Sequence, residues 1–188
     1  MDKKIDLRVI KTYNKLTVAF GEMMKTVSFD EITVFDLCEK AEVRRATFYK
    51  HFDDKYDFFK NLVNIILTNI DKKVSARTKS ASTTDYIIIF VKEIIAYLNA
   101  RPEILNNILN SNAFPVMFDI ITSCTHESLK KHLEDEIRSG TPFPTDAETF
   151  SSFINGGIAT LLISAFKDNR TTEEEILERI DAILKKIF

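Results

Sequence analysis

The sequence predicts an all-α protein of about nine helices. Its 188 residues include only 4 Gly and 4 Pro, a combined share of about 4% where roughly 12% is usual. Sandwiches and barrels need a turn every 8–12 residues or so, and this chain has few residues that form turns. Several segments also repeat apolar side chains at intervals of three and four residues, which is the period of an amphipathic helix.

Four helices are expected in the N-terminal part. In the first, the apolar residues from Val9 to Met23 follow steps of four and three. Thr33 is the expected N-cap of a second helix of barely two turns. The chain breaks near Glu42, and a third, short helix follows. Asp53-Asp54 then offers an N-cap for a long fourth helix. These helices are expected over about residues 5–26, 34–41, 44–51 and 54–75.

Five further helices are expected after a polar stretch at residues 75–84. The first three cover about residues 85–99, 102–110 and 115–138, and Pro102 occupies the first position of its helix. The last two helices begin with capping boxes, Thr145 with Glu148 and Thr172 with Glu175. We expect an N-terminal domain over residues 1–53, a connecting helix over 54–75 and a C-terminal domain over 76–188.

Net charge alone does not point to a polyanionic partner. The 26 basic side chains are outnumbered by 28 acidic ones, a formal charge of −2. Residues 44–52 nevertheless contain three basic residues, one histidine and no acid. The N-terminus lacks an apolar leader, and the longest apolar run, residues 86–91, is much shorter than a membrane span. We expect a cytoplasmic protein with no membrane partner.

No cofactor and no metal site is expected. Cys38 and Cys124 form no CxxC pair. His126 and His132 lie about 240° apart on a helix, whereas a metal-binding pair on a helix is usually spaced i, i+4. Cys38 is expected to pack as a buried thiol, with redox sensing as the alternative. His126 and His132 are expected to be ordinary histidines, with a metal site as the alternative.

The two short helices form a helix-turn-helix whose second helix has a basic outer face. With Phe48 set at zero, Phe52 lies at about 40°, and Ala46 and Lys50 lie near 160° and 200°. The side opposite the aromatic residues is therefore small, polar and basic, which suits the major groove of DNA. The residues expected to contact DNA are Thr33, Arg44, Arg45, Ala46, Thr47, Tyr49, Lys50, His51 and Lys55.

Each residue type on this face has a plausible partner on DNA. Ala46 lets the helix axis approach, and the Thr47 methyl group can meet a thymine methyl group. Arginine and lysine donate to guanine or to phosphate. A solvated basic face is the alternative. For Tyr49 the alternative to a DNA contact is a packing role. For His51 the alternative is a hydrogen bond at the helix end.

These residues resemble the DNA-binding domain of TetR-type transcriptional regulators. The resemblance covers about residues 8–66 and is carried by three segments: Ile32-Thr33-Val34 through Ala41-Glu42-Val43, then Ala46-Thr47-Phe48-Tyr49-Lys50-His51-Phe52, and Lys55. It implies a helix-turn-helix domain, a homodimer, a C-terminal domain for ligand binding and dimerisation, and repression relieved by a small molecule.

Two residues depart from the family pattern. Glu42 stands where glycine is common in the turn, and a left-handed conformation there costs a non-glycine residue about 1 kcal/mol. Arg44 stands where serine often opens the recognition helix, which exchanges a neutral cap for a cation. The operator sequence therefore cannot be copied from relatives.

The C-terminal part contains residues for a ligand pocket and for a dimer interface. The predicted pocket is apolar and aromatic, with ordinary core packing as the alternative; its residues are Tyr86, Phe90, Tyr97, Phe114, Met117, Phe118, Phe150 and Phe153. The predicted interface uses the last two helices in a four-helix bundle, with internal packing as the alternative; its residues are Ile154, Gly156, Gly157, Ile158, Leu161, Leu162, Ile176, Ile180, Ile183 and Ile187.

The preferred hypothesis is a homodimeric repressor that binds a roughly palindromic double-stranded operator and is released by a small apolar or aromatic effector. A DNA-binding activator, or a regulator without an effector, is the alternative on the same fold. An enzyme is disfavoured because the sequence shows no Gly-rich phosphate loop, HExxH motif or nucleophile elbow.

Overall fold

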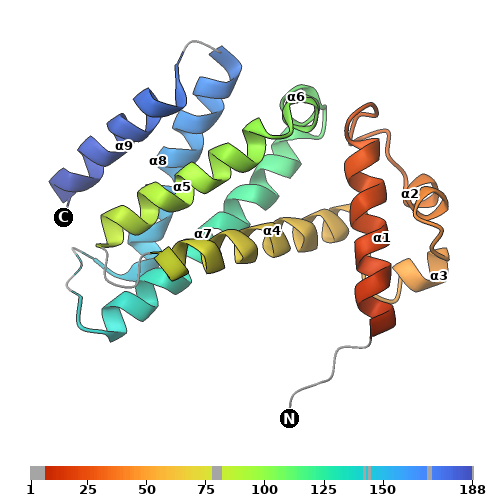
Figure 1. The fold of residues 1–188 in the computed structure, drawn as a ribbon, viewed down its shortest axis with the longest axis horizontal. Helices are drawn as coiled ribbons and strands as arrows, with labels where there is room; N and C mark the ends of the chain where they lie inside the picture. Colours follow the sequence, from red (N-terminus) through yellow and green to blue (C-terminus); the bar gives the residue numbers. More distant parts are fainter. Residues whose placement is uncertain (1–6, 78–81, 142, 144, 169–170, 188) are drawn as a thin grey trace. The chain divides into compact units, whose positions relative to one another are not determined.

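The computed structural model describes residues 7–77, 82–141, 143, 145–168 and 171–187. Over these residues the chain forms nine α-helices and no strand (Figure 1), which confirms the predicted all-α fold. The predicted boundary at residues 75–84 includes residues 78–81, which lie outside the described residues. The helices are α1 (Leu7–Met23), α2 (Val34–Lys40), α3 (Arg45–Phe48), α4 (Lys55–Arg77), α5 (Thr83–Asn99), α6 (Pro102–Asn110), α7 (Phe114–Arg138), α8 (Ala147–Asp168) and α9 (Glu173–Ile187).

Side-chain caps begin α2 and α4 where the sequence predicts them. Thr33 Oγ1 accepts a hydrogen bond from the N–H of Asp36 at 3.1 Å. Asp54 Oδ1 accepts from the N–H groups of Tyr56 and Asp57, both at 2.8 Å. Each cap satisfies N–H groups that have no partner inside their own helix.

The capping boxes predicted for the last two helices have different outcomes. At α9 both halves are present, because Thr172 Oγ1 accepts from the Glu175 N–H and Glu175 Oε2 accepts from the Thr172 N–H. At α8 the prediction of a Thr145 cap is wrong, since Asp146 Oδ1 accepts from the Thr149 N–H at 2.8 Å. A carboxylate is the stronger acceptor near a helix N-terminus, which explains the shift by one residue.

The first of two compact units takes in α1 to α3, the start of α4, all of α6 and the first turn of α7, within Met1–Leu62 and Arg101–Met117. Its core contains a cluster of phenylalanine rings. Neighbouring rings lie edge-on or tilted, with centroids 5.1 Å apart for Phe52 and Phe58 and 5.4 Å apart for Phe20 and Phe58. Such pairs add about 0.5–1.5 kcal/mol to the apolar burial. This core holds α2 and α3 in place, because helices this short are not stable on their own.

The second compact unit spans Val63–Ala100 and Phe118–Phe188. Within it, α9 packs along α5 and α8 (Figure 1). The core face of α9 consists of Ile176, Ile180 and Leu184, which are all buried and are spaced four residues apart. This spacing places them on one side of the helix.

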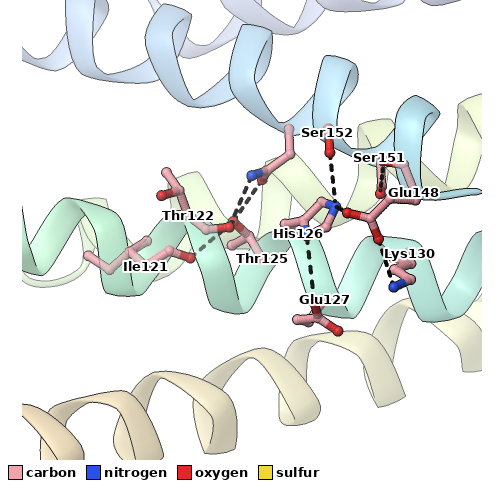
Figure 2. A network of polar contacts seen from close by, with 10 residues as sticks. Ile121, Thr122, Thr125, His126, Glu127, Lys130, Glu148, Ser151 and Ser152 are labelled. Carbon is pink, nitrogen blue, oxygen red and sulfur yellow. Dashed lines mark hydrogen bonds and ion pairs between the residues drawn. The ribbon is translucent and has the colours of Figure 1, made fainter.

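Polar contacts join α7 to α8 inside the second unit (Figure 2). Asn155 Oδ1 accepts from Thr125 Oγ1 at 2.7 Å, and Asn155 Nδ2 donates to the Thr122 carbonyl at 3.0 Å. One turn along, His126 Nε2 lies 3.2 Å from Ser152 Oγ. The residues described include no cluster of three His, Cys, Asp or Glu that could hold a metal ion.

His132 has a separate role in the same unit. Its ring stacks on that of Tyr86, with centroids 3.4 Å apart, and the Tyr86 hydroxyl donates to Asp71 Oδ1 at 2.6 Å. Burial lowers the pKa of His132 below its ordinary value, against the opposing effect of nearby carboxylates. Burial and the bond to Asp71 raise the pKa of Tyr86. This burial favours the neutral form of the packed His132 ring.

Candidate functional site

The helix-turn-helix comprises α2, a short turn and α3. On α2 the side chains of Leu37 and Cys38 are buried, and on α3 that of Phe48 is buried. Burial raises the pKa of the Cys38 thiol, which disfavours the reactive thiolate. The Thr33 hydroxyl both caps α2 and donates to Asp36 Oδ2 at 2.6 Å. Its position at the start of α2 is therefore fixed by hydrogen bonds.

The turn contains a residue in the left-handed conformation. Glu42 has φ 51°, and its N–H donates to the Glu39 carbonyl at 3.1 Å. The next N–H, of Val43, donates to the Cys38 carbonyl at 2.9 Å. The conformation costs a residue with a Cβ about 1–2 kcal/mol. The ion pair between Lys15 Nζ and Glu42 Oε2, at 3.2 Å, is exposed and offsets little of this cost.

Helix α3 is shorter than the sequence predicts. It spans Arg45–Phe48 instead of about residues 44–51. Beyond it, the N–H groups of His51 and Phe52 both donate to the Phe48 carbonyl, at 2.9 and 3.0 Å. The bond from His51 is of the tighter i→i+3 kind that often ends short helices. The turn directs the ring of Phe52 into the aromatic core, where it is buried.

The outer side of α3 carries the expected basic residues. Phe48 faces inward and Thr47 is half-buried. No carboxylate occurs between residues 44 and 52, so the positive charge of this surface is not cancelled within the segment. The exposed side chains are Arg44, Arg45, Ala46, Tyr49 and Lys50.

This surface is able to donate hydrogen bonds to a polyanion. Arginine offers five N–H donors and lysine offers three, and all are positively charged. Ala46 projects only a methyl group between them, so the helix backbone is approachable. Tyr49 adds an exposed hydroxyl group beside the cations. The arrangement suits phosphate and base-edge acceptors in a groove.

His51 packs against α1. Its ring lies edge-on to that of Tyr13, with centroids 5.4 Å apart, and is half-buried. The pKa of Tyr13 is raised, mainly by burial and also by the charge of Asp57. The ring contact is a third role for His51, beside the phosphate contact and the hydrogen bond at the helix end that the sequence left open.

Lys55 holds the loop before α2. Its Nζ donates to the carbonyls of Phe29, Asp30 and Ile32 at 2.9, 2.9 and 2.8 Å. Burial lowers the pKa of Lys55, against the opposing effect of nearby carboxylates. An ammonium group has three N–H donors, and all three are used here. In this conformation none remains for a phosphate, so we assign Lys55 to the loop.

The same loop is tied to α6 and to the α6–α7 turn. Asn107 Nδ2 donates to the carbonyls of Met24 and Val27, at 3.1 and 2.6 Å. Ser111 Oγ donates to Asp30 Oδ1 at 2.5 Å. The hydroxyl of Ser111, followed by that of Ser28, holds the pKa of the Asp30 carboxyl well below its usual range. Sequence reasoning missed these residues, because asparagine and serine at a helix end are common and their partners lie about 80 residues away.

The aromatic residues of the predicted pocket are dispersed. Tyr86, Phe90, Met117 and Phe150 are buried, whereas Phe153 is 70% exposed. Tyr97, Phe114 and Phe118 are half-buried. Phe114 and Met117 fall in the first compact unit and the others in the second.

A polar groove lies between α4 and α7 in the second unit. Its volume is about 540 Å³. The lining includes Asp71 and His132, together with Lys131 and three further carboxylates of α7. None of the eight predicted pocket residues lines this groove or a second hollow, of about 600 Å³, at the end of α7.

The predicted interface residues divide into a buried and an exposed set. Ile154, Leu162, Ile176 and Ile180 are buried within the same chain. Ile158 and Ile187 are half-buried. The exposed set consists of Gly156, Gly157, Leu161 and Ile183.

The exposed side of α8 forms a stripe of apolar and small residues, which we call the apolar stripe and define as Phe153, Gly157, Thr160, Leu161 and Ser164. These residues recur at helical spacing on one face. A Cβ added at Gly157 would meet no heavy atom within 4 Å. By length and composition α8 is the one helix among those described that could cross a membrane, and 28% of its most apolar window is buried. Most residues of that window are therefore not buried within the single chain.

A family model described as "Bacterial regulatory proteins, tetR family" matches residues 22–62. This match covers the end of α1, the whole helix-turn-helix and the start of α4. It includes the exposed cations Arg44, Arg45 and Lys50 of α3 and its two ends. The match thus falls on the surface described above.

Relatives extend the similarity beyond that domain. One relative is the uncharacterized HTH-type transcriptional regulator YxbF of Bacillus subtilis (strain 168), which is 23% identical over 189 residues. The match covers 95% of this chain but only 45% of the length of that protein. A TetR-family transcriptional regulator from Streptomyces coelicolor superposes with a TM-score of 0.65 at 17% identity, over 94% of this chain and 99% of that one. The fatty acid degradation regulator FadR from Bacillus halodurans gives a TM-score of 0.63 at 14% identity, over 92% and 97%.

Proposed function

We propose that this chain, a member of the TetR family of transcriptional regulators, is a homodimeric repressor that binds a roughly palindromic operator through α3 and leaves it when a small molecule binds. One observation carries the DNA-binding part of this proposal. Arg45 and Ala46 are exposed on the second helix of a helix-turn-helix, and Arg44 at its N-cap and Lys50 just beyond its C-cap are exposed beside them in sequence. The aromatic core beneath them fixes that face.

In this proposal α3 enters the major groove with Ala46 toward the base pairs. Arg45 and Lys50 donate to guanine or phosphate acceptors, and Arg44, at the N-cap of α3, reaches the adjoining backbone. Tyr49 donates to a phosphate oxygen, which sets the register of the helix. Thr47 is half-buried, so its reach to a thymine methyl group is shorter than the sequence suggests.

Two copies of the chain would pair through the apolar stripe of α8 and the exposed Ile183 of α9. Gly156 and Gly157 leave room for the backbone of a second helix to approach closely. Phe153 belongs to this surface in our proposal, because it is 70% exposed and thus poorly placed to line a pocket. A two-fold dimer presents two recognition helices to successive major grooves, about 34–36 Å apart.

An effector would bind in the second compact unit, and we place it in the groove between α4 and α7. Its lining of charged and hydroxyl-bearing side chains favours a polar effector over the apolar or aromatic one that the sequence suggests. Helix α4 runs from the first unit into the second. The effector would bind more tightly to a dimer whose recognition helices have a different spacing than to the dimer that fits the operator. The ratio of its affinities for these two forms sets how far it can lower the affinity for DNA. We place this action in the cytoplasm.

The test is a titration of the purified protein with duplexes enriched from a random-sequence pool. We expect one enriched, roughly palindromic sequence, and an affinity that falls steeply with salt. A combined Arg44→Ala, Arg45→Ala and Lys50→Ala variant should lose at least about 100-fold in affinity and show a shallower salt dependence. Lys92→Ala, which removes an exposed lysine of α5, is the matched control and should bind as the wild type does.

The sign of regulation needs a separate measurement. Transcripts should rise when the gene for a repressor is deleted. A fall in the transcript from the enriched site would instead identify an activator. Failure of the wild-type protein to enrich any sequence would contradict the DNA-binding proposal itself.

A further inference from the structure

Phe35 is an exposed aromatic residue next to the recognition helix. It is the second residue of α2 and 54% of its surface is accessible. The other phenylalanines of the helix-turn-helix, Phe48 and Phe52, are buried. Apolar burial therefore does not account for an aromatic side chain at this position.

The ring of Phe35 lies against the side chain of Arg45 on α3. Arg45 Cζ is 5.4 Å from the ring centroid, within the distance of about 6 Å over which a cation is attracted to an aromatic face. Among the described residues, Arg45 is the one cation of the exposed α3 face that lies over a ring. The contact spans the turn, since its two residues belong to different helices.

A ring contact leaves the hydrogen-bonding capacity of arginine intact. The guanidinium group is planar, and its five N–H donors point outward in the plane. An aromatic face attracts the cation electrostatically without accepting any of these hydrogen bonds in the ordinary way. The donors of Arg45 therefore stay available to acceptor oxygens or nitrogens of DNA.

We propose that Phe35 is a positioning residue for Arg45, and this inference rests on the proposed function. The ring restricts the arginine rotamers in the free protein, so that less conformational freedom is lost when Arg45 meets its acceptor. Arg44 lacks this restriction in our proposal. Operator binding should therefore depend on Phe35 only while Arg45 is present.

A double-mutant cycle on the enriched duplex tests this dependence. Phe35→Leu keeps an apolar side chain but removes the ring, and it should weaken binding about two- to fivefold, the range that an exposed cation–ring contact supports. In the Arg45→Ala background the same change should have almost no effect. In the Arg44→Ala background it should keep its full effect, and Phe35→Trp should bind at least as tightly as the wild type.

Two outcomes would overturn the inference while the proposed function stands. One is an equal loss from Phe35→Leu with and without Arg45, which would mean that Phe35 touches DNA itself or supports the fold. The other is no loss in the wild-type background. If the wild-type protein enriches no duplex, the proposed function fails, and the role of Phe35 fails with it.

A measurement without DNA checks the contact separately. In the free protein, ring currents should shift the Arg45 Hδ resonances upfield, and Phe35→Leu should abolish this shift. Unfolding curves of the two proteins should coincide, because Phe35 is exposed. Unshifted Arg45 resonances in the wild-type protein would contradict the inference.

Discussion

The exposed faces of α3 and α8 differ in the chemistry that surrounds their small residues. On α3, Ala46 is flanked by arginine and lysine, whereas on α8 Gly156 and Gly157 lie between Phe153 and Leu161. Both faces let another backbone come close. The charged neighbours suit a polyanion, and the apolar neighbours suit another apolar helix. The residues around a small side chain thus indicate which partner each face accepts.

The two faces also rest on different supports. Helix α3 has four residues and relies on the buried ring of Phe48, whereas α8 has 22 residues and buries six of them. A short helix keeps its place only if the segments that it packs against are fixed, and Lys55 fixes the loop before α2, the helix in contact with α3. We therefore expect changes in the loops to disturb the first face more than the second.

The largest effect should come from charge on the α8 stripe. Phe153→Glu with Leu161→Glu would place carboxylates in an apolar contact, where they lose hydration without gaining partners. We expect the dissociation constant of the dimer to rise at least about 100-fold, measured by sedimentation velocity. Lys92→Glu on α5 is the control and should leave the dimer intact. A doubly substituted protein that still sediments as a dimer would place the interface elsewhere.

The next effect concerns the loop that supports α2. Lys55→Met keeps the aliphatic stem but leaves three carbonyl groups without their donor. We expect the free energy of unfolding to fall by about 2–3 kcal/mol, measured by urea denaturation. Lys50→Met, at an exposed position, should weaken DNA binding without changing stability. The assignment of Lys55 to the loop is wrong if both variants are as stable as the wild type.

A smaller effect concerns pH and the second unit. The pKa of His132 is lowered from its ordinary value of 6.5 by burial, so the unfolded chain binds a proton more readily than the folded chain does. Stability should therefore fall as pH drops below about 6.5, by at most about 1.4 kcal/mol per pH unit. His132→Phe keeps a ring against Tyr86 and should flatten this decline in denaturation curves at pH 7.5 and 5.5. Parallel declines in the two proteins would show that other groups cause it.

The smallest effect should be a gain in stability at the turn. Glu42→Gly removes the left-handed strain of about 1–2 kcal/mol but adds freedom to the unfolded chain. We expect a net increase of about 0.5 kcal/mol in the free energy of unfolding. Glu39→Gly, on α2, is the matched control and should destabilise the protein. A loss of stability in Glu42→Gly would show that the added freedom of the unfolded chain and the lost ion pair with Lys15 together outweigh the strain.

Most helices of the fold were predictable because helix signals are local. Thr33, Asp54 and Thr172 each bond to N–H groups within three residues, so their roles can be read from neighbouring sequence. The error at α8 arose because Thr145 and Asp146 are adjacent and both can cap. The truncation of α3 was not predictable from period alone, since it follows from where the core holds Phe52.

The sequence by itself determined the helical class, the helix-turn-helix and the basic outer face of α3, since period, caps and residue type are properties of short segments. Tertiary structure alone decided that Lys55 bonds to three carbonyls, that Asn107 and Ser111 hold the loop of the first unit, and that Ile154 and Ile180 face inward. Helical period tells which side chains share a face. What covers that face depends on segments that are distant in sequence, and only their packing reveals it.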